Sequence, residues 1–172
     1  MNTAVPRFLD RTTPPHIATL ILIAGISALS MNIFVPSLPN MAAYFQADYG
    51  TMQLSISLYL AFSAGLQLVI GPISDRYGRR RILLISMGVF AVASLGTLLA
   101  PNAEIFLVFR MLQASIATSL ALSRAIVRDM VDEDRAASMI GYVTLGMSVV
   151  PMLGPVIGGA LDEVYGWPGR FL

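Results

Sequence analysis

The chain has 172 residues, of which 56% are hydrophobic and only 12% are charged, and its mean hydropathy is +0.72. Soluble domains carry roughly 25% charged residues, so this composition excludes a soluble domain and indicates an all-α membrane protein. All eleven basic residues are arginine, the net charge is only +1, and there is no cysteine. Nucleic acid is therefore not expected as a partner, and a disulfide framework or a thiolate metal site is excluded.

The N-terminal stretch 1–16 is polar and contains Arg7 and Arg11, so we expect a short cytoplasmic tail. The apolar run 17–36 that follows is about 30 Å long as a helix, which matches the hydrocarbon core of a bilayer. A cleaved signal peptide is the alternative, but the run exceeds the usual ~7–15 apolar residues and lacks an A-x-A site.

Four further apolar runs predict membrane spans at about 51–72, 82–100, 104–127 and 136–161, and a sixth span is expected to begin near residue 167. If the spans alternate in direction, nine of the arginines fall on one side, Arg170 falls on the other, and Arg110 lies inside a span. Arginine collects in short cytoplasmic loops, so the N-terminus is predicted to be cytoplasmic. The region 17–172 is thus expected to be one truncated transmembrane bundle.

The densest charge lies between the second and third runs, in the stretch from Gly71 to Arg81, which we expect to be a water-exposed loop. Its pattern G-x-x-x-D-R-x-G-R-R resembles the loop between the second and third helices of the major facilitator superfamily. The resemblance implies a conformational switch in which Asp75 and Arg79 form a relay with a carboxylate at the end of the fourth span, Asp129. The alternative is that the arginines only keep the loop in the cytoplasm. The switch residues implied are Gly71, Asp75, Arg76, Gly78, Arg79, Arg80 and Asp129.

Two later stretches extend this resemblance. The sequence 110–114, RMLQA, is similar to the family pattern R-x-x-Q-G, and 124–129 resembles the bicyclomycin/chloramphenicol-resistance branch of drug:proton antiporters. The sequence 154–161, GPVIGGAL, is similar to the antiporter motif G-P-x-x-G-G-x-L. In the family this surface meets the opposite half of the transporter; a generic helix contact within this half is the alternative. The motif residues are Gly154, Pro155, Gly158 and Gly159.

Arg110 is the candidate functional residue inside the membrane, because an arginine within a span costs about 2.5–3.5 kcal/mol and normally faces the bundle interior or water. We hypothesise that it lines a substrate cavity and hydrogen-bonds Asn32 or Gln113. Simple snorkelling to the interface is the alternative. The family usually carries Asp at the position of Asn32, and an asparagine cannot carry a proton at physiological pH.

An internal repeat is also suggested, because Gly71-Pro72 with its following Asp, Tyr, Gly and Arg recurs from Gly154-Pro155 onward. Inverted three-helix repeats build each half of such transporters. Convergent use of glycine, proline and arginine at helix ends is the alternative.

These observations predict the N-terminal half of a twelve-helix secondary transporter, comprising five spans and the start of a sixth. The resemblance implies proton-coupled export of small amphipathic compounds by alternating access, with the bilayer and the missing C-terminal half as partners. We expect a multi-pass protein of the cell membrane, the inner membrane if the source is bacterial. Uptake of a small metabolite and a non-transporting five-helix scaffold are the alternatives. No nucleophile-base set, nucleotide loop or metal-ligand spacing occurs, so we expect neither an enzyme nor a cofactor other than protons as coupling ion.

Overall fold

The computed structural model describes residues 16–165, and the predicted sixth span lies outside this range. Every element within it is helical. Five helical stretches are long and apolar enough to cross a membrane: Ile17–Tyr44, Tyr49–Tyr77, Arg79–Leu98, Ala103–Met130 and Ala136–Ala160. The predicted all-α architecture with five spans is confirmed for the described range.

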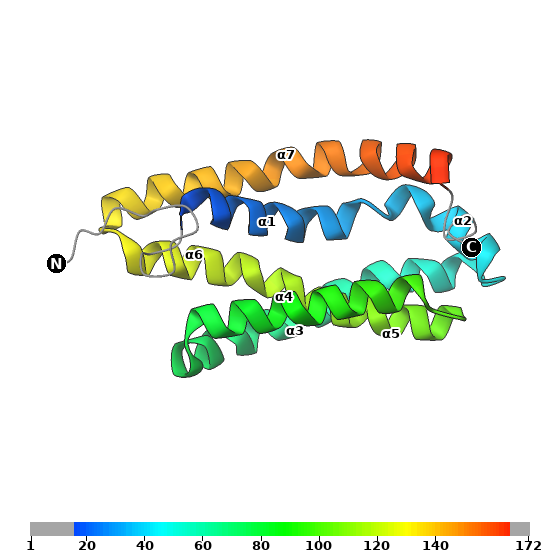
Figure 1. Cartoon of the computed structure of the whole chain (residues 1–172), viewed down its shortest axis with the longest axis horizontal. Coiled ribbons are helices and arrows are strands. Elements are labelled where there is room, and N and C mark those ends of the chain that lie inside the picture. The colour runs from blue at the N-terminus through cyan, green and yellow to red at the C-terminus, as the bar shows by residue number, and fades with distance from the viewer. Residues whose placement is uncertain (1–15, 166–172) are drawn as a thin grey trace.

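Successive stretches run in opposite directions along the long axis of the molecule, which is horizontal in Figure 1. Helix α7 (Glu133–Tyr165) lies beside α1 (Ile17–Asn32), whereas α3 (Tyr49–Tyr77), α4 (Arg79–Leu98) and α5 (Ala103–Gln113) group together on the other flank. Helix α6 (Thr118–Met130) contacts both groups. The fourth span is therefore the centre of the bundle.

The first span is interrupted beyond its midpoint. Helix α1 ends at Asn32, a short 3₁₀ helix η1 (Val35–Ser37) follows, and α2 (Leu38–Tyr44) completes the stretch. Pro36 has no amide hydrogen to donate to the Asn32 carbonyl, so the α-helical ladder cannot pass this point. The predicted end of the span at residue 36 is in fact a break, and the helical course continues to Tyr44.

The predicted loop from Gly71 to Arg81 is wrong as a description of the backbone. Helix α3 continues through Pro72 to Tyr77, α4 begins at Arg79, and Gly78 alone joins them. Gly78 has φ +92° and ψ +128°, a conformation that essentially only glycine adopts. A single residue thus reverses the chain and brings the arginines of α4 close to the end of α3.

Replacing Gly78 with alanine is expected to destabilise the protein by about 1–3 kcal/mol, because alanine is strained at this φ although no neighbouring atom would obstruct its Cβ. Thermal unfolding of the purified protein measures the effect. Gly71→Ala is the matched control, since Gly71 lies in the helix with equally free space around it. Equal stabilities of the two variants would contradict the strain argument.

The fourth span contains a tight 3₁₀ segment, η2 (Ala114–Ala117), between α5 and α6. Two side chains at this segment bind α4: the Ser115 hydroxyl donates to the Ser86 carbonyl at 3.1 Å, and the Thr118 hydroxyl donates to the Ser86 hydroxyl at 3.0 Å. Polar contacts therefore fix the centre of the fourth span against the third.

The outward faces of the bundle are apolar. Large side chains on α4 and α7 are exposed, including Val92, Leu95, Met152 and Val156. Apolar surface on this scale marks contact with a membrane or another protein, and on spans of this length it fits contact with lipid.

Candidate functional site

Among the charged side chains whose exposure the structure describes, Arg110 on α5 is the only buried one, with 4% of its surface exposed. Its Nη1 donates to the Gln113 side-chain oxygen at 2.6 Å, and its Nη2 donates to the Ser30 carbonyl at 2.9 Å. The guanidinium also lies 3.7 Å from the centre of the Phe34 ring and 4.6 Å from that of Tyr59. Arg110 therefore holds α1, α3 and the region around the α1 break together.

The Ser30 contact has a specific structural cause. In an uninterrupted helix the Ser30 carbonyl would accept from the amide of residue 34, but α1 has already ended at Asn32. Arg110 occupies this acceptor instead, and a cation at a helix C-terminus is also favoured by the helix dipole. The sequence reasoning identified Arg110 but missed this role, because the break could not be located from Pro36 alone.

Gln113 extends the cluster to α4. Its side-chain nitrogen donates to the Ser94 hydroxyl at 3.0 Å and lies 3.5 Å from the Thr97 hydroxyl. Ser94 and Thr97 in turn donate to carbonyls of their own helix. The structure thus forms one of the two hydrogen bonds that we hypothesised for Arg110, the one with Gln113.

Asn32 lies elsewhere. Its amide nitrogen donates to the Ala28 carbonyl at 2.8 Å, and no hydrogen bond joins it to Arg110 in the described part of the chain. Asn32 faces α7, where a Cβ on Gly154 would lie 3.3 Å from the Asn32 Cβ. The structure therefore does not form the proposed Arg110–Asn32 contact.

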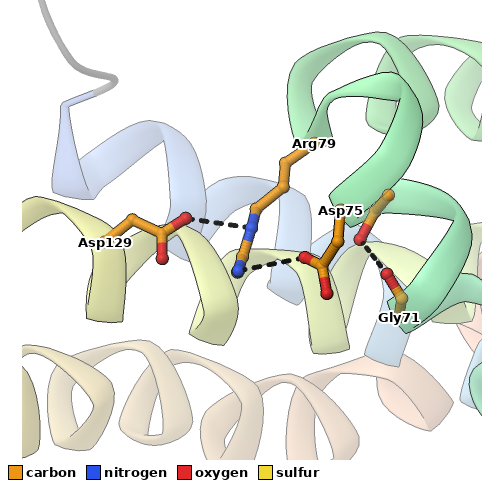
Figure 2. A network of polar contacts seen from close by, with 5 residues as sticks. Gly71, Asp75, Arg79 and Asp129 are labelled. Atoms are coloured by element: carbon orange, nitrogen blue, oxygen red, sulfur yellow. Dashed lines mark hydrogen bonds and ion pairs between the residues drawn. The ribbon is translucent and has the colours of Figure 1, made fainter.

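A second cluster lies at the end of the bundle where α3 turns into α4, which we call the charged end. Arg79 contacts two carboxylates: its Nη2 lies 3.3 Å from Asp75 on α3, and its Nε lies 2.9 Å from Asp129 on α6 (Figure 2). The Arg79 side chain is three-quarters covered, whereas the Asp75 and Asp129 side chains are more than half exposed. One arginine thus joins the ends of three helices.

The remaining residues of this motif take simpler positions. The Ser74 hydroxyl donates to the Gly71 carbonyl at 2.8 Å, one turn earlier in the same helix and next to Pro72 (Figure 2). Arg76 lies over the Tyr77 ring at 5.6 Å, and Arg80 is exposed to solvent. Only Arg79 among these arginines pairs with a carboxylate in the described residues.

Arg79→Lys is expected to preserve membrane insertion but to reduce transport severalfold. Lysine keeps the positive charge, yet its single ammonium cannot make the two directed contacts that the Arg79 fork makes with Asp75 and Asp129. Transport rate per inserted molecule, with insertion measured by surface labelling, tests this. Unchanged transport would favour the purely topological role of the arginine.

Three glycines of α7, Gly154, Gly158 and Gly159, face the first span. A Cβ on Gly158 would run into the carbonyl group of Ile33, so these two backbones touch at the α1 break. A Cβ on Gly159 would lie 4.0 Å from the Pro36 Cβ, which is an ordinary contact, and Pro155 is partly exposed. Gly154 and Gly158 therefore pack against another helix of the same half, which is the alternative given in the sequence analysis. They do not present this face outward.

The proposed repeat is only partly within the described residues. Both Gly-Pro pairs lie inside long helices, at 71–72 in α3 and at 154–155 in α7. The matching Gly166 and Arg170 lie outside the described range.

Five apolar antiparallel helices, held together by a buried arginine cluster and closed at one end by an ion-paired turn, define a multi-pass membrane protein. The sequence profile of the Major Facilitator Superfamily matches residues 20–172. The chain therefore belongs to this superfamily, whose members are transporters, and the resemblance found in the sequence is confirmed at the level of the family.

Several curated relatives are similar along nearly the whole chain. A protein named chloramphenicol resistance protein, from Pseudomonas aeruginosa, is 36% identical over 160 residues, which cover 90% of this chain and 38% of the relative. Multidrug resistance protein MdtM of Salmonella typhimurium is 30% identical over 99% of this chain and 42% of its own length. Multidrug resistance protein D of Escherichia coli is 27% identical over 89% and 39%. The chain thus spans about two fifths of the length of these relatives.

Proposed function

We propose that this chain forms part of a proton-coupled multidrug efflux transporter that works by alternating access, in the branch that includes the bicyclomycin and chloramphenicol resistance proteins. The observation that carries the proposal is the similarity, over 89–99% of the chain, to proteins named for chloramphenicol or multidrug resistance. The chain matches only 38–42% of the length of these relatives, and we propose that the rest of the substrate pathway is formed by regions corresponding to the remainder.

The ion-paired turn supports alternating access. Surface ion pairs contribute only about 0–1 kcal/mol each, so the two contacts of Arg79 can break and re-form at small cost. Because they join α3, α4 and α6, their rupture would free three helix ends at once. This is the behaviour required of a latch that closes one side of the pathway.

The arginine distribution supports placing the charged end in the cytoplasm, in a cell membrane that is the inner membrane if the source is bacterial. Protons remain the proposed coupling ion, and the substrate is a small amphipathic compound. Every acidic residue in the described range lies within three residues of a span end or outside a span. The coupling carboxylate therefore belongs to another part of the transporter, since Asn32 cannot act as one.

Expression of the complete gene in a drug-sensitive bacterium tests the proposal. Cells should accumulate less chloramphenicol than vector controls, a protonophore should abolish the difference, and the exported drug should be recovered chemically unchanged. Equal accumulation with and without the gene would overturn the export proposal, and greater accumulation with the gene would point to uptake. A modified product would indicate an enzyme.

A further inference from the structure

The electrostatics around Arg110 bear on the charge of the compounds that the transporter accepts. Arg110 is buried, whereas Arg124, six residues before the end of the same span, is exposed. No carboxylate among the described residues lies within ion-pair distance of Arg110. The interior of this bundle therefore carries one positive charge and no negative one in its described part.

The partners that Arg110 does have are all neutral. They are an amide oxygen, a backbone carbonyl and two aromatic faces, and they solvate the guanidinium without cancelling its charge. Its Nε is buried and has no hydrogen-bond partner. Asn32, two residues beyond Ser30 on α1, faces α7 and carries a neutral amide that donates to the Ala28 carbonyl of its own helix.

We infer that this uncompensated charge makes the substrate site select neutral and anionic amphipathic compounds over cationic ones. The inference rests on the proposed function, because it requires a substrate cavity next to the Arg110 cluster. Phe34 and Tyr59 cover the guanidinium, so its field acts through space rather than by direct contact. At about 10 Å and an effective dielectric constant of about 20, one unit charge changes a dissociation constant on the order of tenfold.

Two xanthene dyes of opposite charge provide the probe: fluorescein, an anion, and rhodamine 6G, a cation. Their Kd values are measured by fluorescence anisotropy on the purified transporter, expressed from its complete gene, in detergent at low ionic strength and without any gradient. Wild-type protein should bind fluorescein at least tenfold more tightly than rhodamine 6G. High salt weakens the effect, so the salt concentration stays fixed throughout.

Gln113→Glu places a carboxylate where the Gln113 oxygen now accepts from Arg110 at 2.6 Å, with almost no change in shape. The Kd for rhodamine 6G divided by the Kd for fluorescein should fall by roughly tenfold or more. Gln53→Glu is the matched control, because Gln53 is exposed near the outer end of α3 and its variant should retain the wild-type ratio. If Gln113→Glu does not fold, Arg110→Gln, which removes the positive charge itself, should shift the ratio in the same direction.

A wild-type preference for rhodamine 6G, or a ratio that neither folded variant moves, would overturn the inference. Binding and export are measured separately, so the two proposals can fail independently. If the protein binds the dyes in the expected ratio but exports nothing, the charge selectivity is supported and the efflux proposal is wrong. If the protein exports rhodamine 6G in preference to fluorescein, the efflux proposal is supported and the charge-selectivity inference is wrong.

Discussion

Gly158→Ala is expected to lower the stability of the protein by about 1–3 kcal/mol and to reduce the yield of correctly folded protein. The added Cβ would run into the Ile33 carbonyl, which is part of the backbone and cannot rotate away as a side chain can. Helix α7 would have to move away from α1 at the point where α1 is already broken. The loss of close backbone contact should therefore loosen the pair of helices that forms one flank of the bundle.

Size-exclusion chromatography of fluorescently tagged protein after heating measures this effect, which should lower the apparent Tm by several degrees, roughly 3–10 °C. Gly141→Ala on the same helix is the control, because no atom lies within 4 Å of its Cβ position. Alanine is the better helix former by ~1 kcal/mol in soluble peptides, so the control should match the wild type or exceed it. If both variants melt together, close packing at Gly158 does not matter.

The five spans could be predicted from apolar runs alone, but their ends could not. Two predicted spans end at Pro36 and Pro72, yet Pro72 lies inside α3 and Pro36 lies in a break rather than at an end. Spans tolerate proline because neighbouring groups compensate for the missing hydrogen bond, and the sequence does not say where they will. The 3₁₀ segment at Ala114–Ala117 has no sequence signal of its own, since its contacts are with Ser86 on another helix.

The candidate site shows the same limit in its geometry. The depths of Arg110 and Asn32 along their helices could be estimated from the rise per residue, but the direction of each side chain could not. The backbone carbonyl of Ser30 accepts from Arg110, whereas the Asn32 side chain, two residues and about 200° further round α1, points toward α7. The contacts of Phe34 and Tyr59 with Arg110 could not be predicted for a related reason. The sequence of a helix does not determine how the helix is rotated about its axis relative to its neighbours.

The charged end was more accessible to prediction. Asp75 and Arg79 are four residues apart, and the family pattern named both, while Asp129 follows from the end of the fourth span. The structure brings the three side chains together, and their switching role stays a prediction. What the pattern did not reveal is that only one residue, Gly78, separates the two helices.

Arg110→Ala is expected to abolish export and to destabilise the bundle. The change removes both hydrogen bonds of the guanidinium, and it leaves the buried Ser30 carbonyl and Gln113 amide oxygen without the donors they now have. An unsatisfied buried polar group costs about 1–3 kcal/mol, and a space would open between the Phe34 and Tyr59 rings. A loss of export in this variant alone could therefore reflect misfolding.

Arg110→Lys separates a specific role from a merely structural or snorkelling one. Lysine keeps the charge and reaches as far, but a single ammonium cannot bind Gln113 and the Ser30 carbonyl in the same plane while stacking on Phe34. We expect export per folded molecule to fall at least tenfold, a change of about 1.4 kcal/mol in the barrier, while the protein still inserts and purifies as a single species. A snorkelling arginine would be replaced by lysine without loss, because both side chains bury an apolar stem and carry their charge to the interface. Full export by Arg110→Lys would therefore assign Arg110 to the interface and remove it from the substrate site.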